Sequence, residues 1–156
     1  MIEVYDNFFP KEIHEEVFEK LMEPGWRFRG GSLRNTFWHH DGLEQQDYFA
    51  DFLYRTICEK LNKTFKSVKR IYANGQTACQ CGNPHRDDGD LTFLYYPPLV
   101  WDIKWQGHLI FPESERVIFY KPNRAVLFTG QQLHYADAPS RFFNGLRISL
   151  AYKLIT

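Results

Sequence analysis

The sequence predicts a mostly β chain with N-terminal helices, arranged as a jelly roll or barrel with the helices packed on one outer face. Two patterns support this fold class: apolar residues recur at helical spacing in two early segments, and short alternating segments separated by Gly, Pro and Asn follow from residue 67. In addition, aromatic residues make up 17% of the 156 residues, which suits a β-rich core or an aromatic-lined pocket.

Two helices are expected in the N-terminal part. The first begins near Pro10, because proline and acidic residues favour the first helical turn, and it ends at Pro24-Gly25. The second covers about residues 44–62. Its apolar stripe consists of Tyr48, Phe49, Phe52, Leu53, Ile57 and Leu61.

Short strands account for the rest of the pattern. Residues 26–29 and 36–38 form two strands separated by Gly30-Gly31. The later strands are expected at residues 68–72, 91–96, 108–111, 116–120, 125–128 and 146–153. With no repeat or linker, we expect one domain over residues 1–156, in which residues 1–66 are a helical support region and residues 67–156 are the β core.

Charge and composition exclude several classes of partner. Lys plus Arg equals Asp plus Glu at 19 each, so we expect no nucleic acid and no membrane as a partner. No apolar run has the length of a membrane span, and the first residues lack the basic and apolar regions of a signal peptide. Three cysteines do not make an even disulfide framework, so a cytoplasmic location is expected.

His85 and Asp87, together with the distant His134, are candidate metal ligands. In an extended strand residues i and i+2 point the same way, so His85 and Asp87 can share one metal. Two imidazoles and one carboxylate leave part of the coordination sphere open, which is typical of catalytic non-haem Fe(II). A lone His-x-Asp pair is also common in surface turns, so the assignment depends on the surrounding order of residues.

Arg147 and Ser149 share one face of the last expected strand, while Ile148 and Leu150 share the other. A buried arginine without a partner is costly, so an inward Arg147 requires an anion such as a dicarboxylate. Alternatively, Arg147 faces solvent and only the apolar face packs inward. Periodicity alone leaves both interpretations open.

The order of these residues resembles that of the 2-oxoglutarate and Fe(II)-dependent dioxygenases, especially the prolyl-hydroxylase branch. The resemblance covers residues 68–154. Its elements are Tyr72-Ala73-Asn74-Gly75, His85-Arg86-Asp87, a strand ending in Tyr96, Gly107-His108-Leu109, His134, and Gly145-Leu146-Arg147. The fold that it implies is a double-stranded β-helix.

The resemblance also implies roles for individual residues. His85, Asp87 and His134 would bind Fe(II), with 2-oxoglutarate and dioxygen as co-substrates and ascorbate as a candidate reductant. Arg147 would pair with the distal carboxylate of 2-oxoglutarate and, with the three ligands, form the catalytic set. Further co-substrate contacts would come from Tyr96, Ser149, Tyr72, Thr92 and Leu109.

The implied activity is hydroxylation of an unidentified substrate, with a prolyl or other peptide side chain favoured and a small molecule as the other option. The chain departs from the family pattern at Gln106 and His108, at the lip that faces the substrate. The segments 76–84 and 138–144 are also longer than usual and are expected to form enlarged loops.

Three alternative interpretations stay open at this stage. The same fold could be a catalytically silent β-barrel that binds a ligand or partner. It could also be a cupin-type metalloenzyme that does not use 2-oxoglutarate. Finally, Cys79, Cys81 and His85 could form a zinc site, although the spacing is wrong for a zinc knuckle and no second cysteine pair exists.

Overall fold

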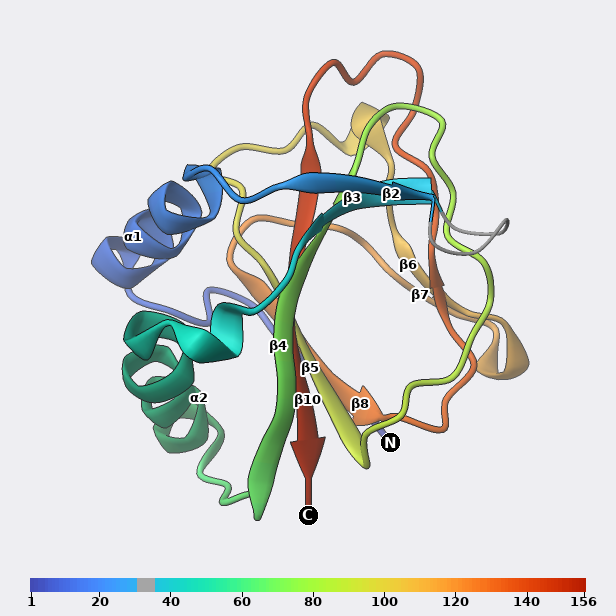
Figure 1. Cartoon of the computed structure of the whole chain (residues 1–156). Coiled ribbons are helices and arrows are strands. Elements are labelled where there is room, and N and C mark those ends of the chain that lie inside the picture. The colour runs from blue at the N-terminus through green and yellow to red at the C-terminus, as the bar shows by residue number, and fades with distance from the viewer. Residues whose placement is uncertain (31–35) are drawn as a thin grey trace.

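The computed structural model describes residues 1–30 and 36–156, and within them the chain forms two facing antiparallel sheets (Figure 1). The larger sheet of this described part has the strand order β1-β8-β5-β10-β4-β3-β2, and the smaller has the order β7-β6-β9. The strands are β1 (Ile2–Tyr5), β2 (Arg27–Gly30), β3 (Thr36–His40), β4 (Ser67–Gln76), β5 (Leu91–Tyr96), β6 (Leu109–Phe111), β7 (Arg116–Ile118), β8 (Arg124–Thr129), β9 (Tyr135–Ala136) and β10 (Arg147–Ile155).

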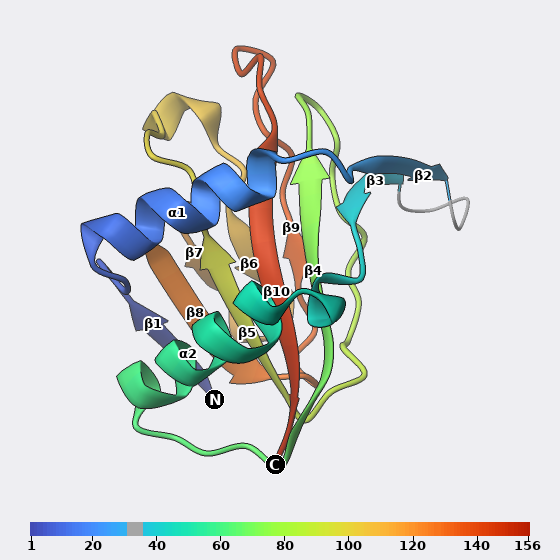
Figure 2. The same ribbon diagram turned by 60° about the vertical axis from the view of Figure 1, so that its left-hand side comes forward.

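The helices α1 (Lys11–Met22) and α2 (Tyr54–Leu61) lie side by side on the outer face of the larger sheet (Figures 1 and 2). Their apolar residues join the sheet in one core, which includes Val17, Leu21, Ile57, Leu150 and Tyr152. A second apolar cluster fills the space between the two sheets. The structure therefore confirms the mostly β jelly roll with helices packed on one outer face.

The strand predictions hold at β5, which has the predicted bounds, and within a few residues at β4, β6, β7, β8 and β10. The strands β1 and β9 were not predicted. Between β2 and β3, Gly31 and the rest of the expected connection lie outside the described residues.

The second helix is less regular than predicted. A 3-10 turn (Leu43–Gln45) and a π-helical stretch (Tyr48–Leu53) precede α2. The buried members of the stripe, Phe49, Leu53, Ile57 and Leu61, recur every four residues. In an α-helix each such step overshoots a full circle by about 40°. The wider π-helical turns reduce that drift, so all four residues reach the core.

The central strand β10 pairs with both β4 and β5 and separates the two clusters. Ile148, Leu150, Tyr152 and Leu154 pack in the core beneath the helices. The alternate side chains, including Arg147, Ser149 and Lys153, point to the other face of the sheet and are also buried. Arg147 is only 1% exposed, so the solvent-facing alternative is wrong.

The segments 76–84 and 138–144 contact each other, because the amide of Cys79 donates to Pro139 O at 2.9 Å. The first segment also contacts β9, where the amide of Gly82 donates to Ala136 O at 2.8 Å. An isolated β-bridge pairs Pro139 with Gln106, one of the two residues at which the sequence departs from the family pattern. Across residues 1–30 and 36–156, none of the helices has the length and apolarity needed to cross a membrane.

Candidate metal and co-substrate site

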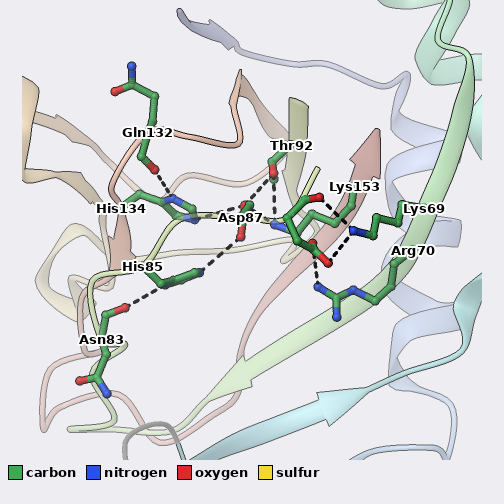
Figure 3. A network of polar contacts seen from close by, with 10 residues as sticks. Lys69, Arg70, Asn83, His85, Asp87, Thr92, Gln132, His134 and Lys153 are labelled. Carbon is green, nitrogen blue, oxygen red and sulfur yellow. Dashed lines mark hydrogen bonds and ion pairs between the residues drawn. The ribbon is translucent and has the colours of Figure 1, made fainter. Parts of the chain in front are cut away.

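The three predicted metal ligands converge, with Asp87 and His134 buried and His85 exposed (Figure 3). One donor atom from each of His85, Asp87 and His134 lies within 4.8 Å of the others. The two histidine backbones hold each other, because each amide donates to the other carbonyl at 3.0 Å. Residues 49 positions apart are therefore locked side by side before any metal arrives. In the described part of the chain no other group of His, Cys, Asp and Glu meets the same criterion, and the cysteines are not part of this one.

Both imidazoles present Nε2 to the centre of the site. Nδ1 of His85 lies 2.8 Å from Asn83 O, and Nδ1 of His134 lies 2.9 Å from Gln132 O. A carbonyl oxygen only accepts, so each Nδ1 carries the proton and each Nε2 keeps a free electron pair. This is the tautomer that a metal requires, fixed by the backbone in advance.

The two histidines differ in their electrostatics. Burial lowers the pKa of His134 to about 4, so this imidazole is neutral throughout the physiological range. The hydrogen bond with Asp87 raises the pKa of His85 above its ordinary value. As the pH falls, His85 is therefore the ligand that takes up a proton first.

Asp87 is held from several sides. Thr92 Oγ1 donates to Asp87 Oδ2 at 2.6 Å, and Lys153 Nζ forms an ion pair with the same oxygen. Burial alone would raise the pKa of Asp87, but the hydrogen bond with His85 and the positive charge of Lys153 outweigh it and hold that pKa well below its usual range. The carboxylate is thus ionised and available to a cation.

Gly130 fixes the backbone of the aspartate segment. Its carbonyl accepts from the Asp87 amide at 2.8 Å, and its amide donates to Asp90 O at 2.9 Å. A Cβ on Gly130 would lie 2.0 Å from the carbonyl oxygen of Gly89, a backbone atom that cannot turn aside.

We expect Gly130→Ala to displace this segment and lower the free energy of unfolding by about 3 kcal/mol, the upper end of ordinary overpacking. Urea unfolding and Mn(II) titration measure the two effects. The control is Gly145→Ala, whose Cβ would lie nearest to the side chain of Phe143, at 2.9 Å, and not to a backbone atom. If Gly130→Ala is as stable and binds metal as well as the control, the Gly130 backbone does not set the position of Asp87.

The other end of the site is a buried guanidinium. Arg147 Nε donates to Gly107 O at 2.6 Å, and Nη1 donates to Gln76 Oε1 at 2.9 Å. The ring of Tyr120 lies 4.4 Å from the guanidinium carbon, and that of Tyr96 lies 5.6 Å from it. Among the described residues, no carboxylate lies within ion-pair distance of Arg147. Such a buried charge calls for an anion from outside the chain.

Two further buried polar atoms are available to bind a ligand. The Tyr96 hydroxyl and the Asn74 Oδ1 atom are buried and have no hydrogen-bond partner among the described residues. Buried polar atoms without partners are rare in native proteins, so each calls for an explanation. Tyr96 lies against Arg147, where both groups can serve the same carboxylate.

A single hollow is lined by His85 and His134 at one end and by Arg147 at the other. Its walls include the predicted residues Tyr72, Leu109 and Ser149 as well as Asn74, Leu94, Ala136 and Lys153. Thr92, predicted to lie behind Tyr96, is at the metal end and bonds to Asp87 and Lys153. Six of the predicted residues therefore line one hollow, and Asp87, Thr92 and Tyr96 contact its lining residues without being part of the lining.

Several residues of the site were not predicted. Gln76 and Lys153 are both buried, and alternation along the strands could have indicated them. Gln76 lies on the same face of β4 as Tyr72 and Asn74, and Lys153 lies on the same face of β10 as Arg147. The Gly107 carbonyl and the Tyr120 ring had no such signal, because chain topology alone brings them to Arg147.

No family model matches this sequence, and no curated protein matches it. Solved structures do. A prolyl hydroxylase from Trichoplax adhaerens, bound to a peptide fragment of hypoxia inducible factor, superposes with a TM-score of 0.73 at 11% identity, covering 99% of this chain and 83% of that one. The viral collagen prolyl hydroxylase of Paramecium Bursaria Chlorella virus-1, in complex with 2-oxoglutarate, gives 0.60 at 15% identity, with coverages of 98% and 94%.

NgTET1 in complex with 5mC DNA gives a TM-score of 0.64 at 14% identity and covers 99% of this chain and 71% of that one. The similar structures thus include one protein in complex with a peptide and one in complex with DNA. At these identities the likeness describes the fold. This chain has the jelly-roll fold that the 2-oxoglutarate and Fe(II)-dependent oxygenases, prolyl hydroxylases among them, adopt.

Proposed function

We propose that this chain is a 2-oxoglutarate and Fe(II)-dependent dioxygenase that hydroxylates a prolyl or other peptide side chain. One observation carries the proposal: His85 and His134, which cluster with Asp87, line the same hollow as a buried guanidinium that has no carboxylate partner among the described residues. That combination suits a small ligand that binds a metal at one end and carries a carboxylate at the other.

The residues present fit both groups. His85 and His134 would hold Fe(II) through Nε2 and Asp87 through a carboxylate oxygen, a donor set that suits this metal. The metal, 2-oxoglutarate and dioxygen together supply the oxidation that places a hydroxyl group on the substrate.

The chain's own part is to bind and orient. Gly107 O and Gln76 Oε1 hold two edges of the Arg147 guanidinium, so its remaining donors are preset for one carboxylate. The Tyr96 hydroxyl, which lacks a partner among the described residues, adds one more donor at that end. Because Arg147 and Tyr96 are buried, water does not compete for these bonds.

The charge balance and an aromatic surface favour a peptide substrate. Positive and negative charges balance, so the sequence lacks the excess of basic residues that typically binds a nucleic-acid backbone. Trp101 and Trp105 form a half-buried aromatic cluster with Phe143. Flat aromatic surfaces suit proline rings and extended chains. Trp26 does not belong to this surface, because it donates to Leu21 O and packs against the helical core.

Succinate formation tests the proposal. With Fe(II), 2-oxoglutarate and air, the protein should release succinate, and proline-containing peptides should raise the rate while oligonucleotides should not. His134→Ala serves as the inactive control. Stimulation by oligonucleotides alone would overturn the substrate class and leave the oxygenase assignment intact, whereas metal binding without any use of 2-oxoglutarate would favour the cupin-type alternative.

A further inference from the structure

Lys153 is a buried cation at the metal end of the hollow, and the binding roles described above do not use it. It is 2% exposed. Its ammonium forms an ion pair with Asp87 Oδ2 and donates to Thr92 Oγ1 at 3.1 Å, as Figure 3 shows. Thr92 in turn donates to the same carboxylate oxygen. Lys153, Thr92 and Asp87 therefore form a closed, buried polar cluster.

This ion pair differs from its neighbours in burial. The next carboxylate along the chain, Asp88, pairs with Lys69 at 3.1 Å and with Arg70 at 3.4 Å, but all three side chains are about half exposed. Exposed pairs of this kind contribute little to stability. In contrast, removing one member of a buried pair leaves an uncompensated charge away from water, which is strongly destabilising.

The two oxygens of Asp87 are treated differently. Each oxygen lies 3.5 Å from one imidazole, Oδ1 from His85 Nε2 and Oδ2 from His134 Nε2, but Oδ2 alone also receives Lys153 and Thr92. A metal held by the two imidazoles and Oδ1 would share one carboxylate with the Lys153 ammonium. The two cations would repel each other over a short distance in a poorly solvated place.

We propose that Lys153 is the resident counter-ion of Asp87: it holds the carboxylate in place in the metal-free protein and weakens metal binding by competing for that carboxylate. The proposal rests on the metal site of the proposed function. It also implies that Asp87 binds the metal through one oxygen, because Lys153 and Thr92 occupy the other.

The test compares Lys153→Met with Lys69→Met, both prepared metal-free. The two substitutions remove the same charge from neighbouring lysine–aspartate pairs, one buried and one exposed. By calorimetric titration, Lys153→Met should bind Mn(II) at least about tenfold more tightly than the wild type, and Lys69→Met within about twofold of it. Equal or weaker Mn(II) binding by Lys153→Met would overturn the competition.

Thermal melts separate a counter-ion from a packing role. Metal-free Lys153→Met should melt below the wild type, and Mn(II) should raise its melting temperature more than that of the wild type. The double variant Asp87→Asn/Lys153→Met removes both charges, so its melting temperature should return to near the wild-type value. Adding Mn(II) should not change that temperature. If the double variant melts no higher than the single one, Lys153 acts by packing and the proposal fails.

These two arms also distinguish the proposal from the function on which it rests. A wild-type protein that binds no Mn(II) would contradict the metal site, and with it the competition. The melting temperatures of the metal-free single and double variants would still decide whether Lys153 is the counter-ion of Asp87.

Discussion

Replacing Arg147 by alanine is expected to raise the KM for 2-oxoglutarate by about 100-fold or more, because truncating one partner of a buried, hydrogen-bonded charge pair costs roughly 3 kcal/mol. The loss should appear in 2-oxoglutarate dependence and spare Mn(II) affinity, since Arg147 is not among the metal ligands. Succinate formation at varied 2-oxoglutarate, together with Mn(II) titration, measures both.

Arg147→Lys should restore only part of the affinity. An ammonium cannot reproduce the planar fork that bonds Gly107 O and Gln76 Oε1 while still presenting donors to a carboxylate. The matched control is Arg141→Ala, an exposed arginine in the adjacent loop. Wild-type 2-oxoglutarate dependence in both Arg147 variants would show that no carboxylate binds there.

The second large effect concerns the metal. Asp87→Ala should abolish measurable Mn(II) binding, because it removes the only anionic ligand of the cluster. It should also lower the free energy of unfolding by about 3 kcal/mol or more, since it leaves Lys153 buried without its counter-ion. Calorimetry and urea unfolding measure these two losses.

His134→Ala separates ligand loss from charge loss, because it removes a neutral ligand and leaves the Asp87–Lys153 pair intact. It should weaken Mn(II) binding with a smaller change in stability. Asp88→Asn, which alters the exposed neighbouring carboxylate, is the control for both. Unchanged metal affinity in Asp87→Ala and His134→Ala would place the metal elsewhere.

Local periodicity accounts for most of what the sequence predicted. The strand β5 alternates between the two clusters, and alternation along β10 places Arg147 and Ser149 on one face, but periodicity did not decide whether that face points inward. That His85, Asp87 and His134 meet was predictable because His85 and Asp87 share one strand-like face and because the resemblance supplies His134.

Long-range pairing accounts for most of what was missed. The strand β1 has four residues and finds its partner, β8, near the far end of the chain, so nothing local marks it. Tyr120 and the Gly107 carbonyl reach Arg147 only because the small sheet folds across the large one. Lys153 is a different case, because the sequence does place it on the same strand face as Arg147. However, a lysine near the end of a strand is usually exposed, and its partner Asp87 lies in another segment.

The most direct test of the central claim is an anaerobic titration of 2-oxoglutarate into the wild-type protein, with and without Mn(II). The site predicts one 2-oxoglutarate per chain, bound at least about tenfold more tightly when the metal is present, because the ligand then engages the metal and Arg147 together. In Arg147→Ala this metal-dependent binding should be lost. Binding that is absent, or equally strong without metal and without Arg147, would contradict a shared metal and 2-oxoglutarate site.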